Sequence, residues 1–195
     1  MDNNPNFDKA ESLARELRLI QPTDSLSLNV VDLEFDRNIC IDSFNNYAAA
    51  TNCTVDELTS GSKLKDGYTI KKGNTNIILY NEPNCYEPRL NWTLAHEVGH
   101  IYMGHKNDGA IEEIEAHWFA AELLIPNPIL IEFLKRGKTV TNYSLMNLFG
   151  VSWEASCKKV SSFNRMPIKS AYLYDDFLEK YGAIIDTDTV EKMLG

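Results

Sequence analysis

The sequence contains no long hydrophobic run, and this limits the class of protein that it can encode. No apolar stretch approaches the ~18 residues that a membrane-spanning helix requires. Residues 1–5 also lack the basic and apolar segments of a secretory signal peptide. We therefore expect a cytoplasmic protein that is not attached to a membrane.

Positive charge is scarce relative to negative charge. The chain has 19 lysine and arginine residues against 28 aspartate and glutamate residues, so its net charge is −9 and its isoelectric point is about 4.9. Proteins that bind nucleic acid irrespective of sequence need a basic surface to neutralise phosphates. The composition therefore argues against direct binding to nucleic acid. A hydrophobic content of 44% is ample for the core of a small domain.

Cysteine is also infrequent. The four cysteines are widely spaced and form no C-x-x-C pair: Cys40, Cys53, Cys85 and Cys157. Such spacing is typical of a protein from a reducing compartment, so we expect buried, reduced thiols.

The most informative feature that is present is an H-E-x-x-H motif at residues 96–100, inside the apolar run 92–103. On a helix, His96 and His100 are i and i+4, so both imidazoles leave the same face one turn apart. That spacing lets both histidines bind one Zn²⁺. Glu97 follows the first histidine and is placed to act as a general base toward water at the metal. The motif therefore supplies two metal ligands and a catalytic base.

A chance occurrence of the motif is the alternative explanation. With ordinary residue usage, it arises in roughly one chain of this length in a few hundred. A chance match would often fall in a loop or a polar stretch, whereas this one lies in a continuous helical pattern. The helical context favours the metal site.

A catalytic zinc site needs a third protein ligand, and a second predicted helix over 109–125 offers four glutamates. Asp108 is a plausible N-cap for this helix. On a helical wheel, Glu113 shares a face with mostly small residues, which allow close approach of a neighbouring helix: Ala116, His117, Ala120, Ala121 and Leu124. We expect Glu113 to point inward, with Glu115 as the alternative and Glu112 intermediate. Glu115 and Glu122 lie on the opposite side, where we expect a solvated face.

Two further histidines follow the motif. His117 lies one turn after Glu113 on the same face, so it is either a fourth polar group of the site or a semi-buried histidine with a backbone partner. His105 lies nine residues after His96 and faces away from the site on a continued helix. The metzincin pattern would need a histidine at position 106, which is Lys106, so that class is excluded.

Hydrophobic spacing predicts the remaining elements. Helices are expected over 7–19, 44–50, 128–136, 142–149 and 152–165, with Asn127 as an N-cap and Pro128 at the first helical position. Partial alternation indicates strand within 26–41, with a helix as the alternative, and the segments 68–71 and 76–80 flank a hairpin turn at 72–75. By analogy with zinc peptidases, strand 76–80 is either an edge strand that pairs with an extended substrate or a covered central strand.

Residues 90–100 (LNWTLAHEVGH) and 113–126 (EIEAHWFAAELLIP) together resemble the ImmA/IrrE family of metallo-endopeptidases. The family pattern is a (F/W)TLAHE-x-GH helix followed by E-x-x-A-N-x-F-A-A-x-L-L-x-P, and the resemblance covers about residues 77–165. It implies a zinc site formed by His96, His100 and Glu113, with Glu97 as the catalytic residue. The family usually has asparagine where this chain has His117.

The expected fold is α+β, with a zincin-like core at residues 1–137 in which a small β-sheet packs on the HExxH helix. A helical C-terminal region at 138–195 follows and is a candidate for partner binding. Residues 143–160 resemble a helix-turn-helix with its turn at Gly150. Trp153 and Glu154 stand where a DNA reader would make base contacts, so we interpret these helices as packing or partner-binding elements.

Two functions from different classes fit the sequence. The first is a zinc-dependent endopeptidase that cleaves a regulatory protein. The resemblance implies that this protein is a helix-turn-helix transcriptional repressor of a mobile element or stress response. The second is a zinc-binding regulator that binds a partner or DNA without cleavage. An intact Glu97 favours the endopeptidase, for which Tyr80, Tyr102 and His117 are candidates to stabilise an oxyanion.

Overall fold

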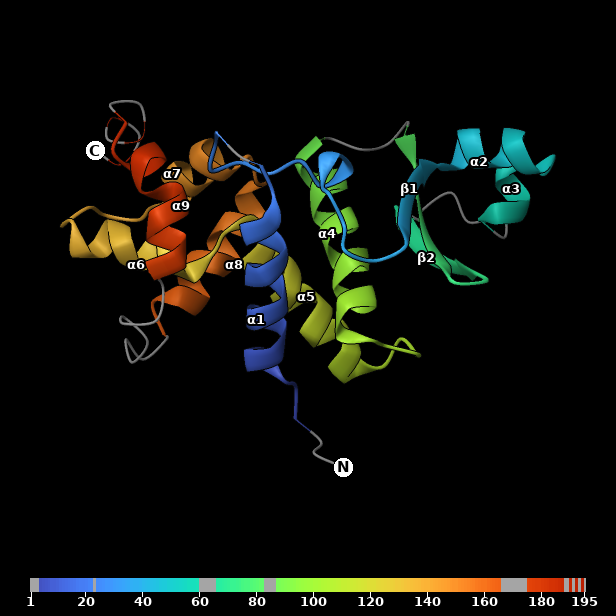
Figure 1. Ribbon diagram of the computed structural model, residues 1–195, viewed down its shortest axis with the longest axis horizontal. Helices are drawn as coiled ribbons and strands as arrows, with labels where there is room; N and C mark the ends of the chain where they lie inside the picture. Colours follow the sequence, from blue (N-terminus) through green and yellow to red (C-terminus); the bar gives the residue numbers. More distant parts are fainter. Residues whose placement is uncertain are drawn as a thin grey trace.

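The computed structural model describes residues 4–22, 24–59, 66–82, 87–165, 175–187, 190, 192 and 194. The described residues form a small mixed sheet and a larger set of helices, which confirms the α+β class. In chain order the elements are α1 (Phe7–Ile20), η1 (Val30–Asp32), β1 (Ile39–Ser43), α2 (Phe44–Thr51), α3 (Val55–Leu58), β2 (Gly67–Lys72), β3 (Thr75–Tyr80), α4 (Glu87–Met103), α5 (Ala110–Leu124), α6 (Asn127–Lys135), α7 (Asn142–Phe149), α8 (Trp153–Phe163) and α9 (Asp175–Ile185). The sheet lies with α2 and α3 at one end of the molecule, α6 to α9 lie at the other, and α1, α4 and α5 lie between them (Figure 1).

The motif helix α4 and the following helix α5 pack closely at the centre of the molecule. A Cβ placed on Gly99 of α4 would lie 3.1 Å from the carbonyl oxygen of Ala116 and 3.2 Å from its Cα. Ala120, one turn further along α5, is also fully buried. The small-residue face of α5 is therefore a packing face, as the helical wheel predicts. Helix α1 packs on α5 as well, and its Ala10 and Ala14 are fully buried.

The sheet has the strand order β1-β3-β2 and packs on α4 through β2 and β3. Strand β3 is parallel to β1 and antiparallel to β2, so Ile78 is paired with Ile41 on one side and Thr69 on the other. The predicted hairpin is confirmed. Of the two alternatives for this strand, the covered central strand is the one present, because β3 is paired along both edges and its Ile78 and Leu79 are fully buried. The edge strand beside α4 is β2.

The predicted strand within 26–41 is limited to β1, and the preceding residues are irregular apart from the short helix η1. A side chain takes the place of a strand partner here. The Asn91 amide of α4 accepts a hydrogen bond from the backbone N–H of Val30 at 2.7 Å and donates one to the carbonyl oxygen of Leu28 at 2.6 Å. The buried backbone of this segment is thereby satisfied without a sheet ladder.

The predicted helices after α5 are present as α6, α7 and α8, although residues 166–174 of the C-terminal region lie outside the described part. Pro126 rather than Asn127 is the N-cap of α6. The expected solvated position of Glu122 is wrong, because its side chain is almost fully buried and forms an ion pair with the buried Lys159 of α8. Glu122 also accepts a hydrogen bond from the backbone N–H of Asn127 at 3.1 Å. A basic partner from a distant helix made burial of this carboxylate possible.

The cysteines are less buried than the sequence predicts. Cys40 is exposed and Cys53 and Cys157 are partly buried, and all three are free thiols. Cys85 lies outside the described residues. Among the helices of the described part, none combines the length and the apolar character that crossing a membrane requires.

Candidate metal centre

Helix α4 presents both motif histidines on the side that faces α5. Their Nε2 atoms are 3.0 Å apart, and the rings meet edge to face with centroids 4.7 Å apart. The i, i+4 spacing accounts for this proximity, because one helical turn places the second side chain over the first. Two nitrogen donors thus point at the same position.

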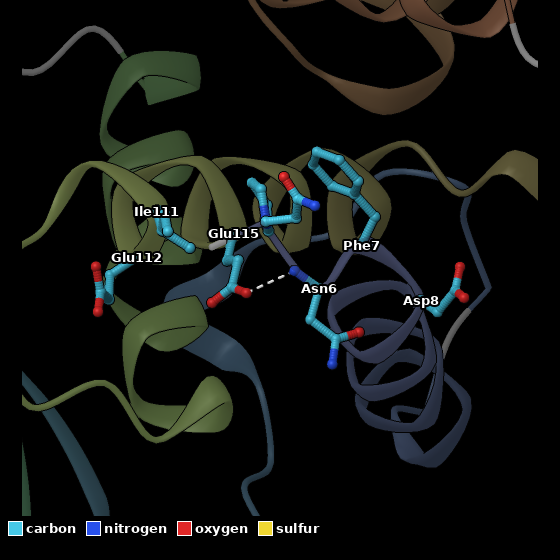
Figure 2. Close-up of a pocket in the computed structure, with 8 residues that line it drawn as sticks. Asn6, Phe7, Asp8, Ile111, Glu112 and Glu115 are labelled. Atoms are coloured by element: carbon cyan, nitrogen blue, oxygen red, sulfur yellow. Dashed lines mark hydrogen bonds between the residues drawn. The ribbon is translucent and has the colours of Figure 1, made fainter. Parts of the chain in front are cut away.

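Glu113, from the first turn of α5, brings its carboxylate close to both of these nitrogens. Its Oε2 lies 3.3 Å from Nε2 of His96, and its Oε1 lies 3.4 Å from Nε2 of His100. Three donors that bind one zinc ion at about 2.1 Å with tetrahedral angles stand about 3.4 Å from one another. The two imidazole nitrogens and the carboxylate group therefore have spacings that suit ligands of a single small cation. Glu112 does not contribute, because its carboxylate lies against Gly109 and points away from Glu115 (Figure 2).

Glu97 is held by the sheet. The hydroxyl of Thr69 in the edge strand β2 donates a 2.6 Å hydrogen bond to Oε2 of Glu97. Burial raises the pKa of Glu97, and the hydrogen bond from Thr69 opposes part of that rise. A raised carboxyl pKa suits a group that must both accept and release a proton. The sequence marks Thr69 only as part of a predicted strand, so its contact with Glu97 was missed.

His96 is mostly buried, and its environment keeps the ring neutral. Burial, together with the neighbouring rings of His117, His100 and His105, lowers the pKa of His96 to about 3. A neutral imidazole is the form that binds a metal. The ring of His117 lies 4.4 Å from that of His96, centroid to centroid, and burial lowers its pKa also. His117 is close enough to share a metal ion with His96 and Glu113, because one possible ligand atom from each of the three residues lies within 4.8 Å of the others.

His105 and Glu115 both depart from their expected positions. His105 was expected to face away, but Nδ1 of His105 lies 2.9 Å from Nδ1 of His100. The helix does not continue as that expectation assumed: α4 ends at Met103, and Gly104, with φ +78°, turns the chain back. Glu115 was expected on a solvated face, but it is buried, and its Oε2 lies 2.8 Å from Nε2 of His105.

Two other residues change their expected roles. Asp108 does not cap α5, whose N-cap is Gly109 without a side-chain hydrogen bond, and a carboxylate oxygen of Asp108 lies within 4.8 Å of donor atoms of His100 and Glu113. Tyr102, a candidate for oxyanion stabilisation, is buried, and its hydroxyl donates a 2.5 Å hydrogen bond to Asp36. The hydroxyl proton of Tyr102 is therefore already used in a hydrogen bond to the segment before β1. For Tyr80, the last residue of β3, the role stays a prediction.

Comparison with protein families shows which family the chain belongs to. Residues 48–161, more than half of the chain, match the family model described as the IrrE N-terminal-like domain of the M78 peptidases. The chain belongs to the ImmA/IrrE family of metallopeptidases. The match includes both helices of the candidate metal centre and the strands β2 and β3 beside them. No curated protein matches the chain closely.

Membership in the ImmA/IrrE family assigns an activity class to the cluster. The chain is a metallopeptidase of the HExxH type, and a protease acts on a protein substrate. Both groups of possible metal ligands in the described residues contain Glu113 and one motif histidine. These groups lie between α4 and the start of α5, within the residues that the family model matches.

Proposed function

We propose that this protein is a zinc-dependent endopeptidase in which His96, His100 and Glu113 bind the metal and Glu97 is the general base. The supporting observation is that the Nε2 atoms of the two histidines lie 3.0 Å apart and each lies 3.3 to 3.4 Å from a carboxylate oxygen of Glu113, with Glu97 on the same turn of α4. Two imidazole nitrogens and one carboxylate are a ligand set of catalytic zinc, in which a fourth position stays open for water or substrate.

The side chains divide the catalytic work. When bound, zinc supplies Lewis-acid chemistry, which favours ionisation of water and polarises a carbonyl group. Glu97 accepts one proton from the attacking water as the new carbon–oxygen bond forms at the scissile carbonyl. It then delivers that proton to the amide nitrogen as the carbon–nitrogen bond breaks, so one carboxylate serves as base and acid. Thr69 occupies Oε2 of Glu97, which leaves Oε1 for the proton transfer.

The edge strand β2 is suited to hold the substrate. Within the described part, β2 pairs with β3 on one side only, and its Thr69 contacts Glu97. An extended peptide that added to the free edge of β2 would form main-chain hydrogen bonds and lie beside the metal. A pocket of about 310 Å³ lies on the other side of the site, between α5 and α8, and is lined by His117, Trp92 and Trp118 among others. It offers space for a side chain of that peptide.

We infer that the substrate is a transcriptional repressor with a helix-turn-helix domain, as the family resemblance suggests. A basic DNA-binding domain complements the net charge of −9 of this chain. The C-terminal region, residues 138–195, is the candidate docking surface. Its helices α7 and α8 do not suit DNA themselves, because Lys159 is buried against Glu122 and Lys158 pairs with Glu154.

Co-expression tests this function. The chain and its Glu97→Gln variant are each expressed with the repressor encoded nearby, and the length of the repressor is followed on a gel. We expect the repressor to be shortened by the wild type and to stay intact with the variant. A repressor that stays intact with both, while its target gene is derepressed equally by both, would favour the non-cleaving regulator.

A further inference from the structure

His100 and His96 differ in how the second ring nitrogen is bound. Nδ1 of His100 lies 2.9 Å from Nδ1 of His105, and Nε2 of His105 lies 2.8 Å from Oε2 of Glu115. In contrast, Nδ1 of His96 is buried and has no hydrogen-bond partner within the part of the chain that the structure describes. A chain of polar side chains therefore leads away from one candidate ligand only.

The carboxylate at the end of this chain fixes where the protons lie. An ionised carboxylate only accepts hydrogen bonds, so Nε2 of His105 donates to Glu115. In the neutral form of His105, Nδ1 is unprotonated and accepts a hydrogen bond from the Nδ1–H of His100. In that tautomer His100 has its lone pair on Nε2, the nitrogen that lies 3.4 Å from Glu113. This is the nitrogen that must be free to bind a metal.

His105 and Glu115 are themselves held in place by residues outside the proposed metal site. The side chains of His105 and Glu115 are only 8% and 11% exposed. The backbone N–H of Asn6, the N-cap of α1, donates a 2.6 Å hydrogen bond to Oε1 of Glu115 (Figure 2). The end of α4 is fixed as well, because Lys9 donates to the carbonyl oxygen of Met103 at 2.8 Å. The start of α1 and the end of α4 thus set the position of the pair.

We propose that Glu115 and His105 are positioning residues that hold His100 in the tautomer and orientation required to bind the metal. The inference rests on the metal site proposed above. Neither residue is one of the three proposed metal ligands, so both act through His100. Partners of this kind typically change metal affinity by about 10–100-fold.

Zinc affinity provides the test. Dissociation constants are measured by competition with a chromophoric chelator for the wild type, His105→Phe, Glu115→Gln and the double variant. We expect each single variant to bind zinc about 10–100-fold more weakly. Because Glu115 acts through His105, the double variant should bind no more weakly than His105→Phe alone. Glu112→Gln, which removes the same charge three residues earlier on α5, should bind zinc as the wild type does.

Melting of the zinc-free proteins separates positioning from a structural role. A purely structural role would lower the melting temperature of the zinc-free variants and leave zinc affinity unchanged, which would overturn the inference. Losses of affinity that multiply in the double variant would also overturn it, because they would show two independent effects. If His100→Ala binds zinc as tightly as the wild type, the proposed metal site itself is wrong and the inference falls with it.

Discussion

Helices α4 and α5 both contribute to the candidate metal centre, but they place their side chains by different means. In α4, the spacing within one turn is enough to bring His96 and His100 together. In α5, the carboxylates of Glu113, Glu115 and Glu122 contact three different sets of partners. Glu113 faces the histidines with a side chain that is 42% exposed, Glu115 binds His105, and Glu122 pairs with Lys159.

The difference shows that a carboxylate acquires its role from the group that it meets, and that group is often distant in sequence. His105 is ten residues from Glu115, and Lys159 is 37 residues from Glu122. Buried carboxylates persist only where such partners compensate for lost hydration. The helical wheel finds the small-residue face of α5, but it contains no information on partners that approach the other faces.

Removal of the proposed ligands should have the largest effect. His96→Ala, His100→Ala and Glu113→Ala are each expected to lose most of the bound zinc, because two donors cannot hold the ion as three do. Glu115→Ala should still contain zinc, although it should bind the metal more weakly. Zinc is measured by elemental analysis after dialysis. Loss of zinc from Glu115→Ala together with retention by Glu113→Ala would show that the third ligand has been assigned to the wrong carboxylate.

Substitution of Glu97 should show whether this residue is a catalytic base or a metal ligand. Glu97→Gln keeps the size and polarity of the side chain but removes its basicity, so zinc content should be retained while cleavage falls by at least about 10²-fold. Thr69→Val, which removes only the hydrogen bond to Oε2, should cause a smaller loss. Cleavage of a purified substrate protein gives both rates. A Glu97→Gln variant that cleaves at the wild-type rate would exclude the hydrolytic mechanism proposed above.

Substitution of Glu122 should lower the stability of the fold and leave zinc binding unchanged. Glu122→Ala leaves the ammonium group of Lys159 buried without its partner, so the free energy of unfolding should fall by about 3–5 kcal/mol. Urea denaturation measures this loss, and zinc content should stay that of the wild type. The matched control is Glu154→Ala, whose pair with Lys158 is exposed and should leave stability nearly unchanged. Equal losses of unfolding free energy in the two variants would show that the buried ion pair contributes no more to stability than the exposed one.

The sequence predicts best where the determinants are local. The helices from α4 to α8, the β2–β3 hairpin and the position of Glu113 beside the motif histidines follow from hydrophobic periodicity, turn residues and the helical wheel of α5. The errors arise where distant groups decide. Asn91 satisfies the backbone near Val30 in place of a strand, and Gly104 turns His105 back toward His100. None of these contacts has a signature in local spacing.

The smallest predicted effect concerns this turn. Gly104 and Gly137 both have a positive φ, +78° and +72°, and a Cβ on either would meet nothing within 4 Å. An alanine at either position should therefore destabilise the fold by the same backbone strain, roughly 1–2 kcal/mol. Only Gly104→Ala should also weaken zinc binding, because relaxation of the turn would move His105 away from His100. Urea denaturation and chelator competition on both variants make the comparison. Equal zinc affinity in the two would mean that the turn after α4 only reverses the chain, whereas weaker binding in Gly104→Ala alone would show that the end of α4 helps to place the ligand.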